Sequence, residues 1–340
     1  MRVLVTGATG LIGSHTAVAL HRAGHELRLL ARDRAKVERV FGPRGIQIDQ
    51  IVVGDVTDSQ TVARALDDCD AVVHAAAVVA LEASRAREVL DTNFRAVELV
   101  IGGAHERKLQ SIVYVSSLSA LFDPGGPPIT VDAPLGTARS AYALSKADGE
   151  RFVRGLQEAG APIRSSYPPA VLGPDDPGLS EGNHTIRAFL RDLMVITSSG
   201  FSLLDARDLA AVHARLVEPH VEAGRYLIPG RWLSWAEMVA LMDELTGRRV
   251  PRLRIPGPLL RRLGRVGDVI KRVRPFDFPL TAEAMDFATQ WPGAVASPEL
   301  ERLGLEFRGA RETCADAIRW LFEAGHLNAA EVGRLADGHG

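Results

Sequence analysis

The sequence predicts an α/β fold, in which a Rossmann-type, doubly wound parallel sheet is joined to a smaller, mostly helical C-terminal subdomain. Three observations support this. Short apolar runs alternate with helical periodicities through the first half of the chain, as in repeated βαβ units. Three glycines follow the first apolar run, where a helical pattern begins. After Pro168 and Pro169 the pattern becomes irregular, and helical patterns dominate from Trp232 onward.

The elements follow from these patterns in order. Strand-like apolar runs cover residues 3–5, 27–30, 48–53, 71–74, 112–115 and 163–167. Helical periodicity covers residues 11–23, 59–66, 86–106 and 141–159. The sixth apolar run contains Ile163-Arg-Ser-Ser166, which is too polar for a buried central strand, so we expect a sheet edge or a local irregularity there. Farther along, residues 204–213 predict a helix and residues 226–228 a short strand.

Composition excludes several classes of protein. The 340 residues carry 40 Lys and Arg against 42 Asp and Glu, so no net positive field marks a nucleic-acid binder. No apolar run reaches the ~18 residues of a membrane-spanning helix, and the N-terminus leads into a strand rather than a signal peptide. Cys69 and Cys314 show no metal-ligand spacing, so we expect free thiols and no metal. These features together predict a cytoplasmic protein.

The glycine-rich turn Thr6-Gly-Ala-Thr-Gly-Leu-Ile-Gly13 places glycine at positions 7, 10 and 13. Such glycines permit a tight turn, let the backbone approach a pyrophosphate and aim the next helix's N-terminus at its charge. The same spacing also serves close packing of a strand on a helix. Because the turn lies directly between a strand and a helix, we favour dinucleotide binding.

Tyr142 and Lys146 stand four residues apart in Tyr-Ala-Leu-Ser-Lys, so both side chains project from one face of a helix. An ammonium held there favours the phenolate and lowers the pKa of a tyrosine from its usual value of about 10. Such a pair also occurs by chance on exposed helices. Downstream of a dinucleotide-binding turn, however, it predicts a proton-handling group in hydride-transfer chemistry.

The end of the second strand bears on the choice of cofactor. In Leu30-Ala-Arg-Asp33, Arg32 occupies the place where an acid selects NAD, so the sequence favours NADP, with Lys36 in support. Asp33 keeps NAD as the alternative, because a shift of one residue would put its carboxylate beside the ribose. A solvated surface pair of Arg32 and Asp33 is the third interpretation.

Three further strand ends carry candidate residues. Asp55, after the third strand, is placed either to accept a hydrogen bond from an adenine amino group or to help begin the next helix. The small side chains of His74-Ala-Ala-Ala77 allow a cofactor close to the backbone. Ser116 and Ser117 follow the fifth strand at the edge where ligands bind. Serines there are often simple turn formers, but the downstream tyrosine and lysine favour a catalytic role.

In combination, these motifs resemble the short-chain dehydrogenase/reductase superfamily, specifically its extended, NAD-dependent epimerase/dehydratase-like branch. The resemblance covers roughly residues 1–215 and is carried by the following motifs: Thr6-Gly-Ala-Thr-Gly-Leu-Ile-Gly13, Gly54-Asp55, His74-Ala-Ala-Ala77, Tyr114-Val-Ser-Ser117, Tyr142-x-x-x-Lys146, residues 168–174 and Asp205-Ala-Arg-Asp208. Within the branch, Ala-Arg-Asp after the second strand is most similar to the dihydroflavonol reductase and carbonyl or 3β-hydroxysteroid dehydrogenase group.

The resemblance implies a role for each matching residue. Tyr142 would be the general acid/base, Lys146 would hold the nicotinamide ribose and depress the pKa of the tyrosine, and Ser117 would hydrogen-bond the substrate oxygen. Asn93 would lie on a long helix behind the site. The implied cofactor contacts are Gly7, Gly10, Leu11, Ile12, Gly13, Arg32, Lys36, Asp55, Val56, Ala75, Ala76, Ala77, Ser116, Tyr142, Lys146, Tyr167 and Pro168.

The resemblance also suggests a domain division and a function. We expect residues 1–167 to bind the dinucleotide and residues 168–340 to bind substrate, with residues 203–230 returning to the first domain. Tyr167-Pro-Pro169 replaces the family's usual Arg-Pro-Gly and removes a cation often found near a diphosphate. We therefore expect an NADP-dependent oxidoreductase that acts on a ketone or aldehyde, or on the corresponding alcohol, of a fairly apolar small molecule.

Two alternatives remain open. One is an NAD-dependent sugar-nucleotide epimerase/dehydratase, and the other, which the Tyr142 and Lys146 pair argues against, is a non-catalytic dinucleotide-sensing protein. A homodimer formed through helices of the nucleotide domain is expected from the family.

Residues 248–274 form a strongly basic stretch, with ten basic side chains and one acid, Asp268. Apolar residues recur within residues 258–273 at steps of three and four, which predicts an amphipathic helix: Leu259, Leu263, Val266, Ile270 and Val273. One interpretation is weak contact with an anionic membrane surface, or a mouth for a lipophilic substrate. We favour the more ordinary arrangement, in which the helix packs on the core and its arginines face solvent.

Overall fold

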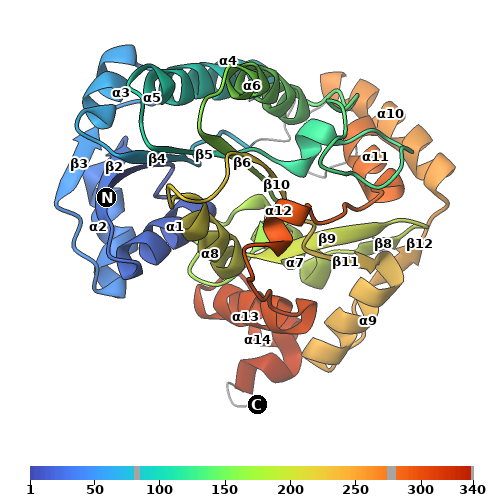
Figure 1. The fold of residues 1–340 in the computed structure, drawn as a ribbon. Helices are drawn as coiled ribbons and strands as arrows, with labels where there is room; N and C mark the ends of the chain where they lie inside the picture. Colours follow the sequence, from blue (N-terminus) through green and yellow to red (C-terminus); the bar gives the residue numbers. More distant parts are fainter. Residues whose placement is uncertain (80–84, 274–280, 338–340) are drawn as a thin grey trace.

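A seven-stranded parallel sheet forms the centre of the computed structural model, which describes residues 1–79, 85–273 and 281–337 (Figure 1). The strand order is β10-β6-β5-β4-β1-β2-β3, and all neighbours pair in parallel. The strands are β1 (Arg2–Thr6), β2 (Glu26–Ala31), β3 (Gln50–Val53), β4 (Ala71–His74), β5 (Ser111–Val115), β6 (Ile163–Tyr167) and β10 (Gly224–Leu227). The order 3-2-1-4-5-6 is that of the doubly wound Rossmann sheet, which confirms the predicted fold class.

Helices cover both faces of this sheet. One face carries α1 (Leu11–Arg22), α2 (Arg34–Phe41) and α8 (Ala206–Leu216). The other carries α3 (Ser59–Leu66), α4 (Ala86–Val97), the π-helical turn Glu98–Gly102, α5 (Gly103–Glu106) and α6 (Ala141–Glu158). The predicted helix over residues 86–106 is thus continuous but contains a π-helical turn, and α2 lies where the sequence predicted no element.

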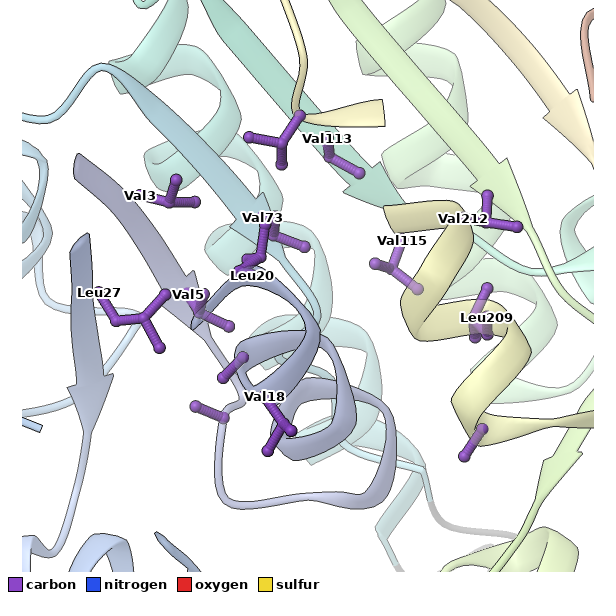
Figure 2. Packing of buried hydrophobic residues seen from close by; sticks show 14 of the residues in the cluster. Val3, Val5, Val18, Leu20, Leu27, Val73, Val113, Val115, Leu209 and Val212 are labelled. Atoms are coloured by element: carbon purple, nitrogen blue, oxygen red, sulfur yellow. The ribbon is translucent and has the colours of Figure 1, made fainter. Parts of the chain in front are cut away.

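The side chains of β1 alternate between two cores, as a period of two requires. Val3 and Val5 pack toward α1 and α8, whereas Leu4 packs toward α3 and α6. Figure 2 shows Val3 and Val5 beside Leu20 of α1, with Leu209 of α8 farther along the same face. These side chains have no solvent exposure, and burying each contributes roughly 1.5–3 kcal/mol.

The polar strand β6 lies inside the sheet, between β5 and β10, and all five of its residues are buried. The prediction of an edge or an irregularity is therefore wrong. Its polar groups find partners on other elements: Arg164 Nε donates to the Val221 carbonyl at 2.8 Å and Arg164 Nη1 to Ser111 Oγ at 2.9 Å. Ser166 Oγ lies 2.9 Å from His213 Nε2 of α8. A buried strand tolerates such residues when their hydrogen bonds are satisfied.

The second half of the chain builds two small sheets and a helical layer. The sheets comprise β7 (Ala170–Leu172), β9 (Gly200–Asp205) and β11 (Arg231–Ser234) in one, and β8 (Met194–Ile196) and β12 (Arg252–Arg254) in the other. The helices are α7 (Glu181–Arg191), α9 (Trp235–Thr246), α10 (Gly257–Val273), α11 (Ala282–Gln290), α12 (Pro298–Glu301), α13 (Ala310–Glu323) and α14 (Ala329–Val332). Of the predicted basic stretch, Arg274 lies outside the described residues.

The helix predicted at residues 204–213 begins at Ala206, because Leu204 and Asp205 end β9. Asp205 then caps α8 by accepting the N–H of Arg207 at 2.8 Å. After α8 the chain returns to the main sheet as β10, which pairs with β6. Within the described ranges, no helix is both long enough and apolar enough to cross a bilayer.

Candidate active site

The carboxyl ends of β1, β2, β4 and β5 lie at one edge of the parallel sheet, which is where ligands bind in open α/β sheets. The glycine turn, Arg32, the alanines after His74, and Ser117 each directly follow one of these strands. The sheet topology therefore brings together residues that are separated by more than a hundred positions along the chain.

The glycine turn packs too closely against its neighbours for side chains. Gly7 has φ +71°, and a Cβ there would lie 2.7 Å from the backbone of Ala75 and Ala76. A Cβ on Gly13 would overlap the Gly7 carbonyl oxygen and lie 2.9 Å from the Ala8 Cα. Close packing of strand on helix is thus part of what these glycines do.

The same turn also fits a pyrophosphate. Gly10 is exposed at the N-cap of α1, where no side chain caps the helix. The first N–H groups of a helix lack intrahelical partners and carry a partial positive charge, so an uncapped N-terminus at this edge suits an anion. Leu11 is buried and Ile12 half-buried in the first turn of α1.

Arg32, directly after β2, is exposed and forms no hydrogen bond or ion pair with any residue that the structure describes. Its neighbour Asp33 is the N-cap of α2, accepts the N–H of Ala35 at 2.8 Å and pairs with Arg39 at 3.5 Å. Arg32 and Asp33 are thus both on the surface, as the third interpretation has it, but they do not pair with each other. Lys36 is half-buried in the first turn of α2.

Asp55 does not begin α3. The helix is capped by Asp58, whose carboxylate accepts the N–H of Thr61 at 3.1 Å. Asp55 instead accepts the N–H and hydroxyl of Thr57 at 2.9 and 2.7 Å, and these bonds lower the pKa of the Asp55 carboxyl. Asp55 is exposed and ionised next to the half-buried Val56, at the end of the third strand.

Asn93 joins the loop after β4 to the helix that carries the tyrosine. Its amide is buried in α4, accepts the N–H of Val78 at 2.7 Å and donates to the Val78 carbonyl at 3.0 Å. It also donates to Ser145 Oγ of α6 at 3.0 Å, and that hydroxyl donates to the Tyr142 carbonyl at 2.8 Å. Ala75, Ala76 and Ala77 lie in the loop so fixed.

Ser117, Tyr142 and Lys146 come together at the end of β5. Tyr142 lies in the first turn of α6, which Ser140 caps by accepting the N–H of Ala143 at 2.7 Å. The Lys146 ammonium is buried, donates to the Val115 carbonyl at 2.9 Å and lies 5.9 Å from the centre of the Tyr142 ring.

Two opposing influences act on the Tyr142 phenol. Burial raises its pKa to about 12, and a hydrogen bond with Ser117 opposes that rise. The expectation that Lys146 lowers the pKa of Tyr142 is not met in this structure, because burial dominates and the ammonium is committed to the Val115 carbonyl. At neutral pH, Tyr142 therefore holds its proton.

Burial lowers the pKa of Lys146 to about 8, and the charge of Glu150 opposes this change. Glu150 lies one turn farther along α6 and is completely buried. Its carboxylate accepts a hydrogen bond from Arg154 Nε at 2.7 Å, from Ser116 Oγ at 3.3 Å and from the Tyr167 hydroxyl. This network holds the Glu150 carboxylate, and so a negative charge, in place near Lys146.

Glu150 was not among the residues predicted for the site. Its signal was in the sequence, because the four-residue step from Tyr142 to Lys146 continues to Glu150 and Arg154. Lys146, Glu150 and Arg154 therefore form a row of charged side chains on one face of the predicted helix. In the fold this row extends from Tyr142 into the interior.

Two predicted cofactor contacts have side chains that face elsewhere. Ser116 and Tyr167 are buried and hydrogen-bonded to Glu150, so neither side chain lines the open edge of the sheet. Pro168 is also buried, and its carbonyl accepts the N–H of Leu118 at 3.1 Å, next to Ser117. Contact with a cofactor through these backbones stays a prediction.

An aromatic cluster lies on the C-terminal side of the site. Phe122, which follows the short 3₁₀ helix after Ser117, stacks on Phe287 of α11 with ring centres 4.3 Å apart. Trp291 contacts both rings, at 5.3 Å and 5.7 Å. Ala143, adjacent to Tyr142, belongs to the same buried cluster. The segment that follows Ser117 is therefore packed into an apolar cluster.

The comparisons agree with this arrangement. The model of the NAD dependent epimerase/dehydratase family matches residues 3–228. Sterol demethylase protein B of Methylococcus capsulatus is 26% identical over 96% of this chain and 100% of the relative. A putative dihydroflavonol 4-reductase of Synechocystis sp. is 24% identical over 95% of each chain. A UDP-glucose 4-epimerase of Neisseria meningitidis is 33% identical, but over 46% of this chain and 48% of the relative.

Solved structures show the same fold. A nucleoside-diphosphate-sugar epimerase from Pseudomonas aeruginosa has a TM-score of 0.76 at 23% identity, covering 96% of this chain and 99% of that one. A UDP-glucose 4-epimerase from Bifidobacterium longum, in complex with NAD⁺ and UDP, has a TM-score of 0.71 at 21% identity with the same coverage. At these identities the likeness concerns the fold alone.

Proposed function

The chain belongs to the NAD-dependent epimerase/dehydratase family of extended short-chain dehydrogenases/reductases, which are NAD(P)-dependent enzymes, and we propose that it is an NADP-dependent carbonyl reductase. Its substrate is a ketone or aldehyde on a fairly apolar small molecule, or the alcohol in the reverse direction. The observation that carries this proposal is the placement of Tyr142 and the buried Lys146 on one face of α6, beside Ser117, at the sheet edge that also holds the glycine turn.

Arg32 supports the choice of NADP. Its guanidinium is exposed at the end of β2 and pairs with none of the described residues, and a guanidinium matches the geometry and charge of a 2′-phosphate. The competing carboxylate of Asp33 is committed to the N-terminus of α2 and to Arg39. The available guanidinium of Arg32 and the occupied carboxylate of Asp33 therefore both favour binding of a ribose 2′-phosphate over a ribose 2′-hydroxyl.

Two observations support an apolar substrate. The segment that follows Ser117 packs into an aromatic cluster of Phe122, Phe287 and Trp291. The relatives that match along almost the whole chain carry the names sterol demethylase protein B and dihydroflavonol 4-reductase, whereas the UDP-glucose 4-epimerase matches less than half of it. The relatives that match the substrate subdomain therefore favour a reductase over an epimerase.

Ser117, Tyr142 and Lys146 have separate roles in the transfer of a proton to the substrate oxygen. Tyr142 holds a proton at its phenolic oxygen and gives it to the substrate oxygen, while the Ser117 hydroxyl positions that oxygen and steadies its developing charge. Lys146, backed by Glu150, supplies a positive charge beside the phenol and a donor for the ribose of the cofactor. Bound NADPH supplies the hydride.

The proposal is tested by mixing the purified protein with NADPH or NADH and a panel of aromatic, steroid and aliphatic carbonyl compounds. We expect oxidation of NADPH that depends on an apolar carbonyl compound and is slower with NADH. No turnover of any carbonyl compound, together with tightly bound NAD in the purified protein, would overturn it.

The second candidate is an NAD-dependent sugar-nucleotide epimerase/dehydratase, which the matching family model and the 33% identical UDP-glucose 4-epimerase of Neisseria meningitidis favour. The two candidates are separated by the nucleotide that copurifies and by activity on UDP- or dTDP-sugars. A 2′-phosphate on the nucleotide supports the reductase, and conversion of a UDP-sugar by a protein carrying NAD supports the epimerase.

A further inference from the structure

Helix α10 turns its most apolar face to solvent. Leu259, Leu263, Val266 and Ile270 follow one another at steps of four, three and four residues, and they are between 40% and 54% exposed. Val269 is 60% exposed beside them. The favoured expectation, that α10 packs its apolar face on the core, is therefore wrong. An exposed apolar stripe of this length on one helix marks an interaction surface.

The opposite face of α10 explains this orientation. A Cβ on Gly264 would lie 2.6 Å from the Thr281 carbonyl and 2.7 Å from Met285 Cγ, so α10 approaches α11 closely through a glycine. Leu260 is 4% exposed on the same packing face. Asp268, the single acid of the basic stretch, accepts the N–H of Ala282 at the N-terminus of α11. The contacts of α10 with α11 therefore do not use Leu259, Leu263, Val266 or Ile270.

The flanks of the exposed stripe are cationic. Arg262 and Arg265 are exposed on α10, and Arg254 and Leu253 are exposed on β12 just before it. In the described part of the chain, the side chains of these three arginines form no hydrogen bond or ion pair. On α10, exposed apolar and cationic side chains thus lie side by side, and the acid faces inward.

We propose that this outer surface of α10 docks on an anionic phospholipid bilayer. A helix lying in the membrane interface buries an apolar stripe among the lipids while flanking arginines meet the phosphates. Charge complementarity selects this occupant. A second copy of the chain would bring Arg262 and Arg265 against their own counterparts, and like charges repel.

The position of α10 connects docking to the active site, and this step rests on the proposed function. α10 packs on α11, which contributes Phe287 to the aromatic cluster beyond Ser117 (Figure 1). A lipophilic carbonyl compound dissolved in the bilayer would then meet the enzyme on the side of this aromatic cluster.

The test is flotation of the purified full-length chain with vesicles of phosphatidylcholine alone or with added phosphatidylglycerol. We expect binding to the anionic vesicles that falls with salt, and little binding to the neutral ones. Arg262→Gln with Arg265→Gln should weaken binding about tenfold or more, and Val266→Ser with Ile270→Ser should do the same. Phe94→Ser and Arg87→Gln, at exposed positions of α4, serve as matched controls that retain binding.

Equal flotation of all variants, or no binding to anionic vesicles, overturns the proposal, as does self-association that the Val266→Ser, Ile270→Ser variant disperses without any vesicle binding. Turnover of a water-soluble carbonyl compound is measured on the same variants and should not change. Vesicle binding without turnover would contradict the proposed reaction and leave the docking surface intact.

Discussion

Glu150 and Lys146 face the same buried space one turn apart on α6, and the carboxylate raises the pKa of an ammonium that burial otherwise lowers to about 8. The pair links the catalytic helix to the interior, because Glu150 also holds Ser116 and Arg154. The charge on Lys146 near neutral pH therefore depends on a residue that touches neither substrate nor cofactor, so Glu150 is a positioning residue.

This relationship predicts opposite pH shifts for two substitutions. In Glu150→Gln the opposing charge is lost, so the pKa of Lys146 falls and the alkaline limb of the pH profile of kcat/KM moves to lower pH. In Arg154→Met the carboxylate loses its own partner and acts more strongly on Lys146, so the limb moves to higher pH. Both variants lose about 3–5 kcal/mol of stability, because each leaves a buried charge network incomplete.

The two profiles are measured alongside the melting temperature. A merely structural role for Glu150 would lower both melting temperatures and leave the two limbs unmoved or shifted in the same direction. The Glu150→Asp variant, which keeps the charge, should restore much of the original profile.

Gly13→Ala should prevent formation of the glycine turn. The added Cβ would overlap the Gly7 carbonyl and the Ala8 Cα, both of them backbone atoms that cannot rotate away. We expect loss of dinucleotide binding in titration calorimetry and a stability loss of about 1–3 kcal/mol. Gly155→Ala in α6 is the matched control, since its Cβ meets nothing within 4 Å and alanine favours a helix by about 1 kcal/mol. Equal behaviour of the two variants would contradict the packing argument.

Arg32→Ser should change the preference between the two dinucleotides. Loss of a charge-assisted bond to a 2′-phosphate should raise the Kd for NADPH about 10- to 100-fold and leave the Kd for NADH nearly unchanged. Fluorescence titration with both nucleotides measures this. Arg87→Ser, which removes the same charge from exposed α4, should change neither Kd. Equal losses for NADPH and NADH in Arg32→Ser would place the guanidinium elsewhere than the 2′-phosphate.

His213 should make the fold acid-sensitive. Its imidazole is buried between Thr16 Oγ1 and Ser166 Oγ at 2.9 Å each, and burial lowers its pKa to about 3. As pH falls below 6.5 the unfolded chain binds this proton first, so stability falls by about 1.4 kcal/mol per pH unit until the folded pKa is reached. Urea unfolding at several pH values between 6.5 and 5 gives the free energy of unfolding at each pH. In His213→Gln this free energy should fall less steeply with decreasing pH than in the unmodified protein. The exposed His220→Gln is the control, and an unchanged slope in His213→Gln would contradict the argument.

The main sheet was predictable because its strands are short apolar runs bounded by turn residues. The bounds predicted for β4, β6 and α3 agree with the structure, those of β1 and β2 differ by one residue at each end, and those of β5 differ by one residue at the start. The failures have physical causes. β6 looked too polar because the partners of Arg164 and Ser166 come from segments far along the chain. α2 is short, charged and held by the Asp33 cap, so it has little periodicity to recognise.

The site was predictable in outline, because strand ends of a parallel sheet share one edge. Ser117, Tyr142 and Lys146 meet there as expected. The pKa of Tyr142 was not predictable from spacing, since it depends on how deeply the fold buries the ring. The side-chain directions of Tyr167 and of the apolar face of α10 depend on tertiary packing, which helical or strand periodicity alone does not report.

The most direct test compares Tyr142→Phe with Tyr226→Phe in the reduction of an accepted carbonyl compound by NADPH. Tyr226 is a buried tyrosine outside the site whose hydroxyl donates to the Glu222 carbonyl at 2.6 Å. We expect Tyr142→Phe to lower kcat by about 10²- to 10⁴-fold with the Kd for NADPH unchanged, and Tyr226→Phe to keep most of its activity. A Tyr142→Phe enzyme that turns over at the rate of the unmodified protein would contradict the central claim.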